Sequence, residues 1–315
     1  MTPIADVTLH NIGQLTASGI INGALYALLG VSFALILGVT GRFHFAYAFV
    51  FTMSAYVAAA LQESVGGPYA LLMIIGLVCA AILGCLIEGI VYRPLARSSG
   101  ALALLTIFVA SLGITIAGEN VIRLTWGSSS KTLSGPTIAG MGILDIDFTS
   151  LDAAIVFVCV LLILGLAAML RYTRPGRIIK AVRINPDMSL VVGINPGRVY
   201  LWVFAIGSLL GGVAAMLTAV KYAVVPDMGS RPVVFAFVVA FLGGTRSSPI
   251  VVGLAGFFLG LVESLSGLWL SSQWAELIVF AVLFVYLSLR PVEVRRLVDL
   301  VRPKGPLAPP VAAKA

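Results

Sequence analysis

The sequence has 315 residues, of which 60% are hydrophobic and only 10% are charged. An average soluble domain carries roughly 25% charged residues, so this composition excludes an ordinary water-soluble protein. The formal charge of +7 would favour a nucleic-acid-binding protein if the basic residues formed one solvated face, but they lie in short loops between apolar runs. The sequence therefore predicts a multi-pass protein of the lipid bilayer, with no nucleic acid as partner.

Nine apolar runs predict membrane-spanning helices. A helix needs about 20 apolar residues to cross roughly 30 Å of hydrocarbon. In chain order the predicted spans are 15–38, 43–62, 69–92, 101–124, 151–171, 199–222, 232–248, 249–270 and 274–290. The predicted fold class is all-α, a polytopic transmembrane helical bundle of about nine spans that forms one domain over residues 1–302. Residues 303–315 are rich in Pro and Ala and are predicted to form a disordered tail.

The distribution of basic residues predicts which end of each span lies in the cytoplasm, because cytoplasmic loops carry an excess of Lys and Arg. Sixteen of the 20 basic residues lie in alternate loops and in the C-terminal tail. The opposite side holds only Arg123, Lys131, Lys221 and Arg231. We therefore expect the N-terminus outside, the C-terminus in the cytoplasm, and an odd number of crossings.

The seventh span is shorter than the others. Only residues 233–242 separate Pro232 from Gly243, which corresponds to about 15 Å of helix. A re-entrant half-helix is the alternative, since broken helices mark substrate sites in many transporters. That arrangement would place the basic tail outside, so we favour a short crossing helix that ends in a Gly-rich cytoplasmic turn.

Small residues recur at four-residue spacing within several spans. In lipid, such residues allow helix backbones to approach closely, so we expect them to pack inside the bundle, with a conformational hinge as the alternative. The three groups are Gly76, Ala80 and Gly84; Gly207, Gly211 and Ala215; and Gly256 and Gly260.

No catalytic constellation is present in the sequence. Its two histidines, His10 and His44, provide neither a catalytic triad nor a His-based metal cluster, and Cys79, Cys85 and Cys159 lie inside apolar runs without metal-ligand spacing. No Gly-rich phosphate loop occurs either. We therefore expect no enzyme activity, metal or cofactor in this chain, and any ATP must be bound by partner subunits.

The acidic residues inside the spans are expected to be structural, because a charge at a helix centre costs about 2.5 kcal/mol or more. Glu119 and Arg123 are four residues apart, which predicts an ion pair within one helix. Glu88 is expected to reach Arg93 or the membrane interface, and Glu263 to make a buried polar contact with a neighbouring helix. Too few acidic residues lie within the spans to form a proton or sodium relay, which weakens the interpretation as a secondary transporter.

The segment of about 172–198 is cytoplasmic in this topology and contains helix signals rather than linker composition. Asn185 and Pro186 predict a helix N-terminus, with Asp187 in its first turn, and Gly193 predicts its end. Met188, Leu190, Val191 and Val192 give the short helix an apolar surface. An exposed apolar surface favours a docking partner, with the bilayer surface as the alternative site.

Several motifs along the chain resemble those of bacterial branched-chain amino acid ABC transporter permeases. The segment just described resembles the family's cytoplasmic coupling loop through Gly176, Arg177, Ala181, Gly193, Ile194 and Asn195. Further matches, in order, are Asn22-Gly23 with Tyr26-Ala27-Leu28, Tyr92-Arg93-Pro94-Leu95, Leu124 to Gly127, Leu242-Gly243-Gly244 with Ser247-Ser248-Pro249, and Leu259 to Leu265.

The resemblance implies a permease subunit of an ATP-binding-cassette importer in the bacterial inner membrane. Its partners would be two ATPase subunits that grip the 176–195 region, a second permease subunit (a paralogue or a second copy) and an external substrate-binding protein. The implied cargo is a branched-chain or other small hydrophobic amino acid, or a related amide or carboxylate. The alternative is a secondary transporter or channel for a small neutral solute, and a membrane-embedded enzyme is a third interpretation.

The chain departs from the family in the stretch after the first helix. Phe45, Tyr47 and Phe49 lie where a Phe-Ala-His-Gly-acid stretch is usual, and Thr245-Arg246 also differ from the usual Gly-rich turn. We expect these three aromatic residues, with Met228 and Phe235, to line or gate the translocation path. The alternative is that they belong to an aromatic belt at the membrane interface.

Overall fold

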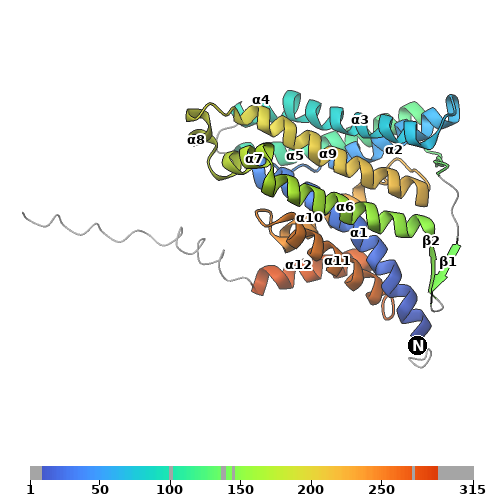
Figure 1. Ribbon diagram of the computed structural model, residues 1–315. Helices are drawn as coiled ribbons and strands as arrows, with labels where there is room; N and C mark the ends of the chain where they lie inside the picture. The colour runs from blue at the N-terminus through green and yellow to red at the C-terminus, as the bar shows by residue number, and fades with distance from the viewer. Residues whose placement is uncertain (1–8, 99–101, 136–139, 144–145, 272–273, 290–315) are drawn as a thin grey trace, which may run out of the picture.

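The computed structural model describes residues 9–98, 102–135, 140–143, 146–271 and 274–289, which form a helical bundle with one small hairpin (Figure 1). In chain order the elements are α1 (Leu9–Thr40), α2 (Tyr47–Ser64), α3 (Tyr69–Leu86), the π-helical turn η2 (Ile87–Tyr92), α4 (Arg93–Ser98), α5 (Ala103–Trp126), β1 (Gly140–Ile143), β2 (Ile146–Thr149), α6 (Ser150–Tyr172), α7 (Arg174–Ile184), α8 (Pro186–Val191), α9 (Pro196–Lys221), α10 (Ser230–Gly243), α11 (Pro249–Ser266) and α12 (Ala275–Leu289).

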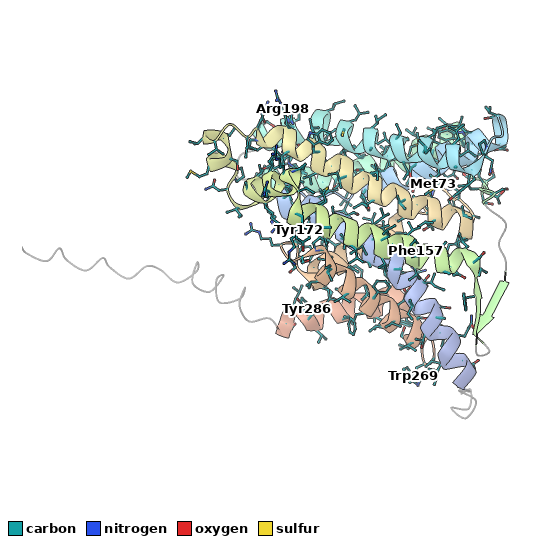
Figure 2. All side chains as sticks on the ribbon, in the orientation of Figure 1. Met73, Phe157, Tyr172, Arg198, Trp269 and Tyr286 are labelled. Carbon is teal, nitrogen blue, oxygen red and sulfur yellow. The ribbon has the colours of Figure 1, made fainter. Side chains whose placement is uncertain are left out.

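The two ends of the bundle differ in chemistry. The helices α4, α7 and α8 lie at one end, together with the turn between α10 and α11, and the β1–β2 hairpin lies at the other end beside α1 (Figure 1). We call these the basic end and the hairpin end. Tyr286, near the end of α12, lies toward the basic end, whereas Trp269, after α11, lies toward the hairpin end (Figure 2). The basic end carries Arg93, Arg97, Arg171, Arg174, Arg177, Lys180, Arg183, Arg198 and Arg246.

A helix coincides with each predicted span, and six segments are long and apolar enough to cross a membrane by themselves. These six are 11–40, 69–98, 103–126, 150–172, 196–221 and 249–266. The helix α2 is not among them, and α10 and α12 contain shorter apolar helices. A multi-pass membrane protein is therefore confirmed, while the count of nine crossings and the compartment of each end stay predictions.

The helix α10 runs in the same direction as α1 and ends at the basic end. The residues that face each other increase in number in the same direction along the two helices: Tyr26 faces Phe235, Gly30 faces Val239, and Gly38 faces Thr245. The helix α11 runs in the opposite direction, since Ala27 faces Gly256 and Gly23 faces Gly260. The chain of α10 does not turn back toward the hairpin end before Gly244. This glycine has a φ of +83° and lies in the predicted Gly-rich turn. This geometry agrees with a short crossing helix rather than a re-entrant one.

Residues 222–229 are not helical, and they connect the end of α9 at the hairpin end to the start of α10 inside the bundle. At the hairpin end Val224 pairs with Lys131 through two backbone hydrogen bonds of 2.8 and 2.9 Å. Five residues later the amide of Gly229 donates to Thr52 Oγ1 at 3.0 Å, inside the bundle. Irregular backbone at this depth requires protein cover, and Val224, Pro226 and Gly229 are buried.

The predicted packing of the small residues is confirmed. Gly256 and Gly260 lie against α1, and a Cβ on Gly260 would overlap the backbone of Gly23. On the other side of the bundle, Gly84 lies against Ser208 and Gly211 lies against Tyr47. In lipid, burying an apolar side chain against another helix gains little free energy, because the lipid tails are equally apolar. Close packing between helices therefore contributes most of the stability.

The described residues depart from the all-α prediction in one place. Residues 140–143 and 146–149 form an antiparallel pair, β1 with β2. The chain then enters α6 through a capping box in which Thr149 and Asp152 bond reciprocally, and Lys221 Nζ at the end of α9 lies 2.5 Å from Asp152 Oδ1. The predicted tail of 303–315 lies outside the described residues.

Candidate functional site

The predicted coupling segment folds into two short helices at the basic end. In α7, Thr173 Oγ1 accepts a hydrogen bond from the Gly176 amide at 3.2 Å, and Pro175 occupies the first turn. Gly176 is buried and lies so close to the end of α6 that a Cβ there would overlap the backbone at Met169. The helix α7 was not predicted from the sequence, although Thr173, two residues before Pro175, and the apolar Ile179 and Val182 were a usable signal.

The helix α8 has the predicted caps. Asn185 Oδ1 accepts from the Met188 amide at 3.0 Å, and Gly193 ends the helix with φ of +81°. The Ile194 amide then donates to the Ser189 carbonyl at 2.9 Å, and Asn195 Oδ1 accepts from the Gly197 amide at 3.0 Å to begin α9. These bonds hold the turn in one conformation.

The outer surface of α8 is apolar and uncovered. Leu190 is 56% exposed, Val191 81% and Val192 72%, and Met188 next to the exposed Asp187 is 64% exposed. In α7, Arg177 is also exposed, while Ala181 is half-buried. A rigid helix with four exposed apolar side chains outside the bundle is typical of a docking surface for another protein. Their role in docking stays a prediction.

Contacts of two arginine side chains connect this end of the bundle to the start of α9. Glu88 has no exposed surface and forms an ion pair with Arg42, which also lies over the Tyr200 ring at 5.2 Å from the ring centroid. Arg93 instead donates to the Gly197 carbonyl at the start of α9. The expectation that Glu88 reaches Arg93 or the interface was therefore wrong, because the α1–α2 connection brings Arg42 into the core.

The predicted path residues occupy different environments. Tyr47 and Phe235 have no exposed surface: the Tyr47 hydroxyl hydrogen-bonds with Ser32, and the Phe235 ring stacks on Tyr26. Tyr47 is therefore a core residue of the single chain rather than part of an interfacial belt. Phe49 is half-buried and packs on Gly118, and Met228 is half-buried in the irregular segment before α10. Whether these residues contact cargo stays a prediction.

Phe45 lines an apolar groove. The groove has a volume of 530 Å³ between α5, α10, α12 and the α1–α2 connection. Thr115 Oγ1 of α5 donates to the Phe45 carbonyl at 3.0 Å and holds that connection in place. We call this the aromatic groove; its lining residues are Phe43, Phe45, Leu104, Leu105, Phe108, Val234, Phe237 and Phe280.

A charged cluster lies at the start of α10, on the helix that also lines the aromatic groove. Arg231 Nη2 lies 3.2 Å from Glu263 Oε1, and Arg231 Nε lies 3.6 Å from Glu276 Oε1. The predicted contact of Glu263 with a neighbouring helix is therefore confirmed. Glu119 accepts from the Ser230 hydroxyl, so the predicted Glu119–Arg123 pair was wrong.

From the sequence, Arg231 was interpreted only as a marker of topology. Its side chain is 51% exposed and that of Glu276 is 57% exposed, whereas that of Glu263 is only 11% exposed. Opposite charges are thus held beside an apolar groove, with Val234 of the groove one helical turn after Arg231. A small molecule with a positive group, a negative group and an apolar side chain would find a partner for each here.

The chain is similar in sequence to known transport permeases. The family described as "branched-chain amino acid transport system / permease component" matches residues 15–287. The high-affinity branched-chain amino acid transport system permease protein LivH of Salmonella typhimurium is 30% identical over 288 residues, 87% of this chain and 92% of LivH. LivH of Escherichia coli strain K12 has the same identity and coverage. BraD of Pseudomonas aeruginosa is 28% identical over 90% of this chain and 94% of BraD.

No solved structure matches the chain. The family match begins within α1 and ends within α12, so it takes in the coupling segment, the aromatic groove and the charged cluster together. This chain belongs to the family of branched-chain amino acid transport system permease components.

Proposed function

We propose that the chain is the membrane-spanning permease subunit of an ATP-driven importer for branched-chain or other small hydrophobic amino acids. The observation that carries this proposal is the rigid, uncovered apolar surface of α8 at the basic end. A secondary transporter has no need for such a surface, whereas a permease driven by a separate ATPase requires one. The names of the relatives support the cargo class.

The proposed orientation places the basic end in the cytoplasm, because Lys and Arg favour that side. Two ATPase subunits would then bind α8 of this chain and of a second permease subunit, and an external binding protein would deliver cargo at the hairpin end. The bacterial inner membrane is the proposed location. Movement of α8 would reach the bundle through the contact of Arg93 with Gly197 and through the Arg42–Glu88 pair below Tyr200.

The proposed path follows α10 from the charged cluster to the aromatic groove. An amino acid carries an ammonium group and a carboxylate, which Glu276 and Arg231 would bind as they exchange their mutual contact for cargo. An apolar cargo side chain fits the uncharged wall formed by Val234 and Phe237. Farther along, Phe43 stacks on Phe241 with ring centroids 6.3 Å apart, where a closed inner gate would lie.

The function is tested by uptake into proteoliposomes that contain this chain with its copurified ATPase and permease partners, with the binding protein added outside. We expect labelled leucine, isoleucine or valine to accumulate only when ATP is present inside and hydrolysed. Accumulation that persists without the ATPase subunits, or that follows a sodium or proton gradient, would favour the secondary transporter instead.

The path is tested by the substitution Arg231→Gln. Removing a charged hydrogen-bond donor costs about 1.5–3 kcal/mol, so uptake at low cargo concentration should fall about 10- to 100-fold while the assembled complex is retained. The matched control is Arg123→Gln, which removes one exposed charge from the same outer region without touching the cluster. Equal uptake by the two variants would remove Arg231 from the path.

A further inference from the structure

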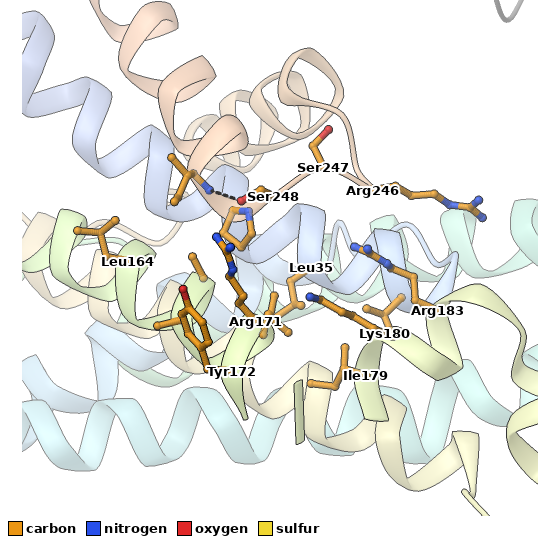
Figure 3. Close-up of a pocket in the computed structure, with 16 residues that line it drawn as sticks. Leu35, Leu164, Arg171, Tyr172, Ile179, Lys180, Arg183, Arg246, Ser247 and Ser248 are labelled. Atoms are coloured by element: carbon orange, nitrogen blue, oxygen red, sulfur yellow. Dashed lines mark hydrogen bonds between the residues drawn. The ribbon is translucent and has the colours of Figure 1, made fainter. Parts of the chain in front are cut away.

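A second cavity lies at the basic end, away from α8 and from the aromatic groove. It has a volume of 510 Å³ and is enclosed by the end of α1, the end of α6, α7 and the α10–α11 turn. Arg171, Lys180 and Arg183 extend from α6 and α7 toward the turn, where Ser247 and Ser248 lie (Figure 3). We call it the basic pocket.

The positive charge of the basic pocket is uncompensated. Four cations line it, the three named above and Arg246, and no Asp or Glu is among the lining residues. None of the four forms an ion pair within the described residues, whereas acidic partners are present for Arg42 and Arg231. Burial, and then the charge of Arg246, lower the pKa of the Arg183 guanidinium. Like charges gathered in a partly enclosed space favour a bound anion.

The other wall of the basic pocket is apolar. Leu35 and Val39, near the end of α1, and Leu164, in the second half of α6, line it. From Leu164 an exposed apolar stripe continues along α6 toward the middle of the membrane through Leu161 and Phe157, which are 56% and 67% exposed. Spacings of three and four residues place the three side chains on one face of the helix.

We propose that the basic pocket binds an anionic phospholipid. The phosphate group would lie among the four cations, and an acyl chain would lie along Leu164, Leu161 and Phe157. A free phosphate ion matches the cations but leaves the apolar wall and the stripe unused. An acidic side chain of a partner protein matches the cations equally, but it also leaves the exposed apolar stripe of α6 unused. The combination of both walls therefore favours a lipid headgroup.

Such a lipid would join the coupling segment to the path. Lys180 and Arg183 belong to α7, which precedes α8, and Arg246 and Ser248 belong to the turn that ends α10. Without a bound anion the four cations repel one another. A bound phosphate would offset this repulsion and hold α7 and this turn together.

The test compares lipid retention by the purified full chain. The chain is exchanged from detergent into nanodiscs of phosphatidylcholine containing a minority of phosphatidylglycerol, then re-extracted, and retained lipids are quantified by mass spectrometry. We expect phosphatidylglycerol to be enriched, and Arg171→Gln/Lys180→Gln to weaken its retention about 25-fold, since each basic residue near an anionic surface contributes about fivefold. The control Arg174→Gln/Arg198→Gln removes two exposed charges at the same end outside the basic pocket and should retain the lipid.

Three results would overturn the proposal. Equal retention of phosphatidylcholine and phosphatidylglycerol would show that charge is not recognised. Displacement of the lipid by millimolar inorganic phosphate would identify a phosphate-ion site. Unchanged lipid retention in the basic-pocket variant would show that these cations do not hold the lipid.

Discussion

The buried pair of Arg42 and Glu88 should be among the most sensitive points of the fold. Both side chains are at most 9% exposed, so the substitution Glu88→Gln leaves a buried guanidinium without its counter-ion. Removing one partner of a buried pair costs about 3–5 kcal/mol. The Tyr200 ring, 5.2 Å from the guanidinium, offsets part of this, so we expect the lower value of about 3 kcal/mol.

The exposed pair of Lys131 and Glu63 provides the control, since the Glu63 side chain is 69% exposed. For a chain of this size the entropy of unfolding is roughly 0.7 kcal/mol/K, so 3 kcal/mol corresponds to a fall in the midpoint of thermal unfolding of about 4–5 °C. The substitution Glu63→Gln should cost no more than about 1 kcal/mol. Both midpoints are measured on the purified chain in the same detergent.

A double substitution separates charge from packing. Arg42→Met/Glu88→Leu replaces the pair by apolar side chains and should recover most of the lost stability, because no unpaired charge remains. The reasoning is refuted if Glu88→Gln unfolds at the same temperature as Glu63→Gln, or if the double variant is less stable than Glu88→Gln.

Two further predictions concern topology and the core. A reporter fused after Arg302 should behave as cytoplasmic and one inserted near Ser129 as external; an external signal at Arg302 would contradict the short crossing of α10. Tyr47→Ala should lower the unfolding midpoint and the yield of assembled complex, because it leaves a cavity beside Gly211 and costs about 3–5 kcal/mol. Normal stability with an altered preference for cargo, measured by uptake of leucine against valine, would return Tyr47 to the path.

Features specified by neighbouring residues were predictable from the sequence. The caps of α8 are an example, since Asn185, Pro186 and Gly193 each act on the adjacent backbone. The same holds for the small-residue faces, which need only helical spacing to be recognised. The Gly-rich turn after α10 also follows from its own residues, because Gly244 adopts a positive φ.

Features that depend on distant partners were not predictable. Glu88 pairs with a residue 46 positions earlier rather than with the nearby Arg93, and Glu119 bonds Ser230 across 111 positions instead of Arg123 four residues away. Tyr47 differs from the family pattern, which favoured a role in the path, yet Gly211 of α9 provides the space that buries it. No local pattern contains that information. The groove that Phe45 lines likewise exists only because α5, α10 and α12 meet there.

If α8 couples the bundle to a separate ATPase, its apolar surface must contact that ATPase. Leu190→Asp/Val191→Asp places charge on that surface, outside the membrane-spanning helices, so membrane insertion should be unaffected. The control Val65→Asp changes a residue as exposed as Val191, 80% against 81%, at the hairpin end.

The measurement is ATP hydrolysis by the copurified complex, with and without cargo-loaded binding protein. We expect the α8 variant to lose the bound ATPase and the stimulated hydrolysis, whereas Val65→Asp should retain both. If the α8 variant copurifies with the ATPase and hydrolyses ATP at the normal stimulated rate, α8 is not the docking surface.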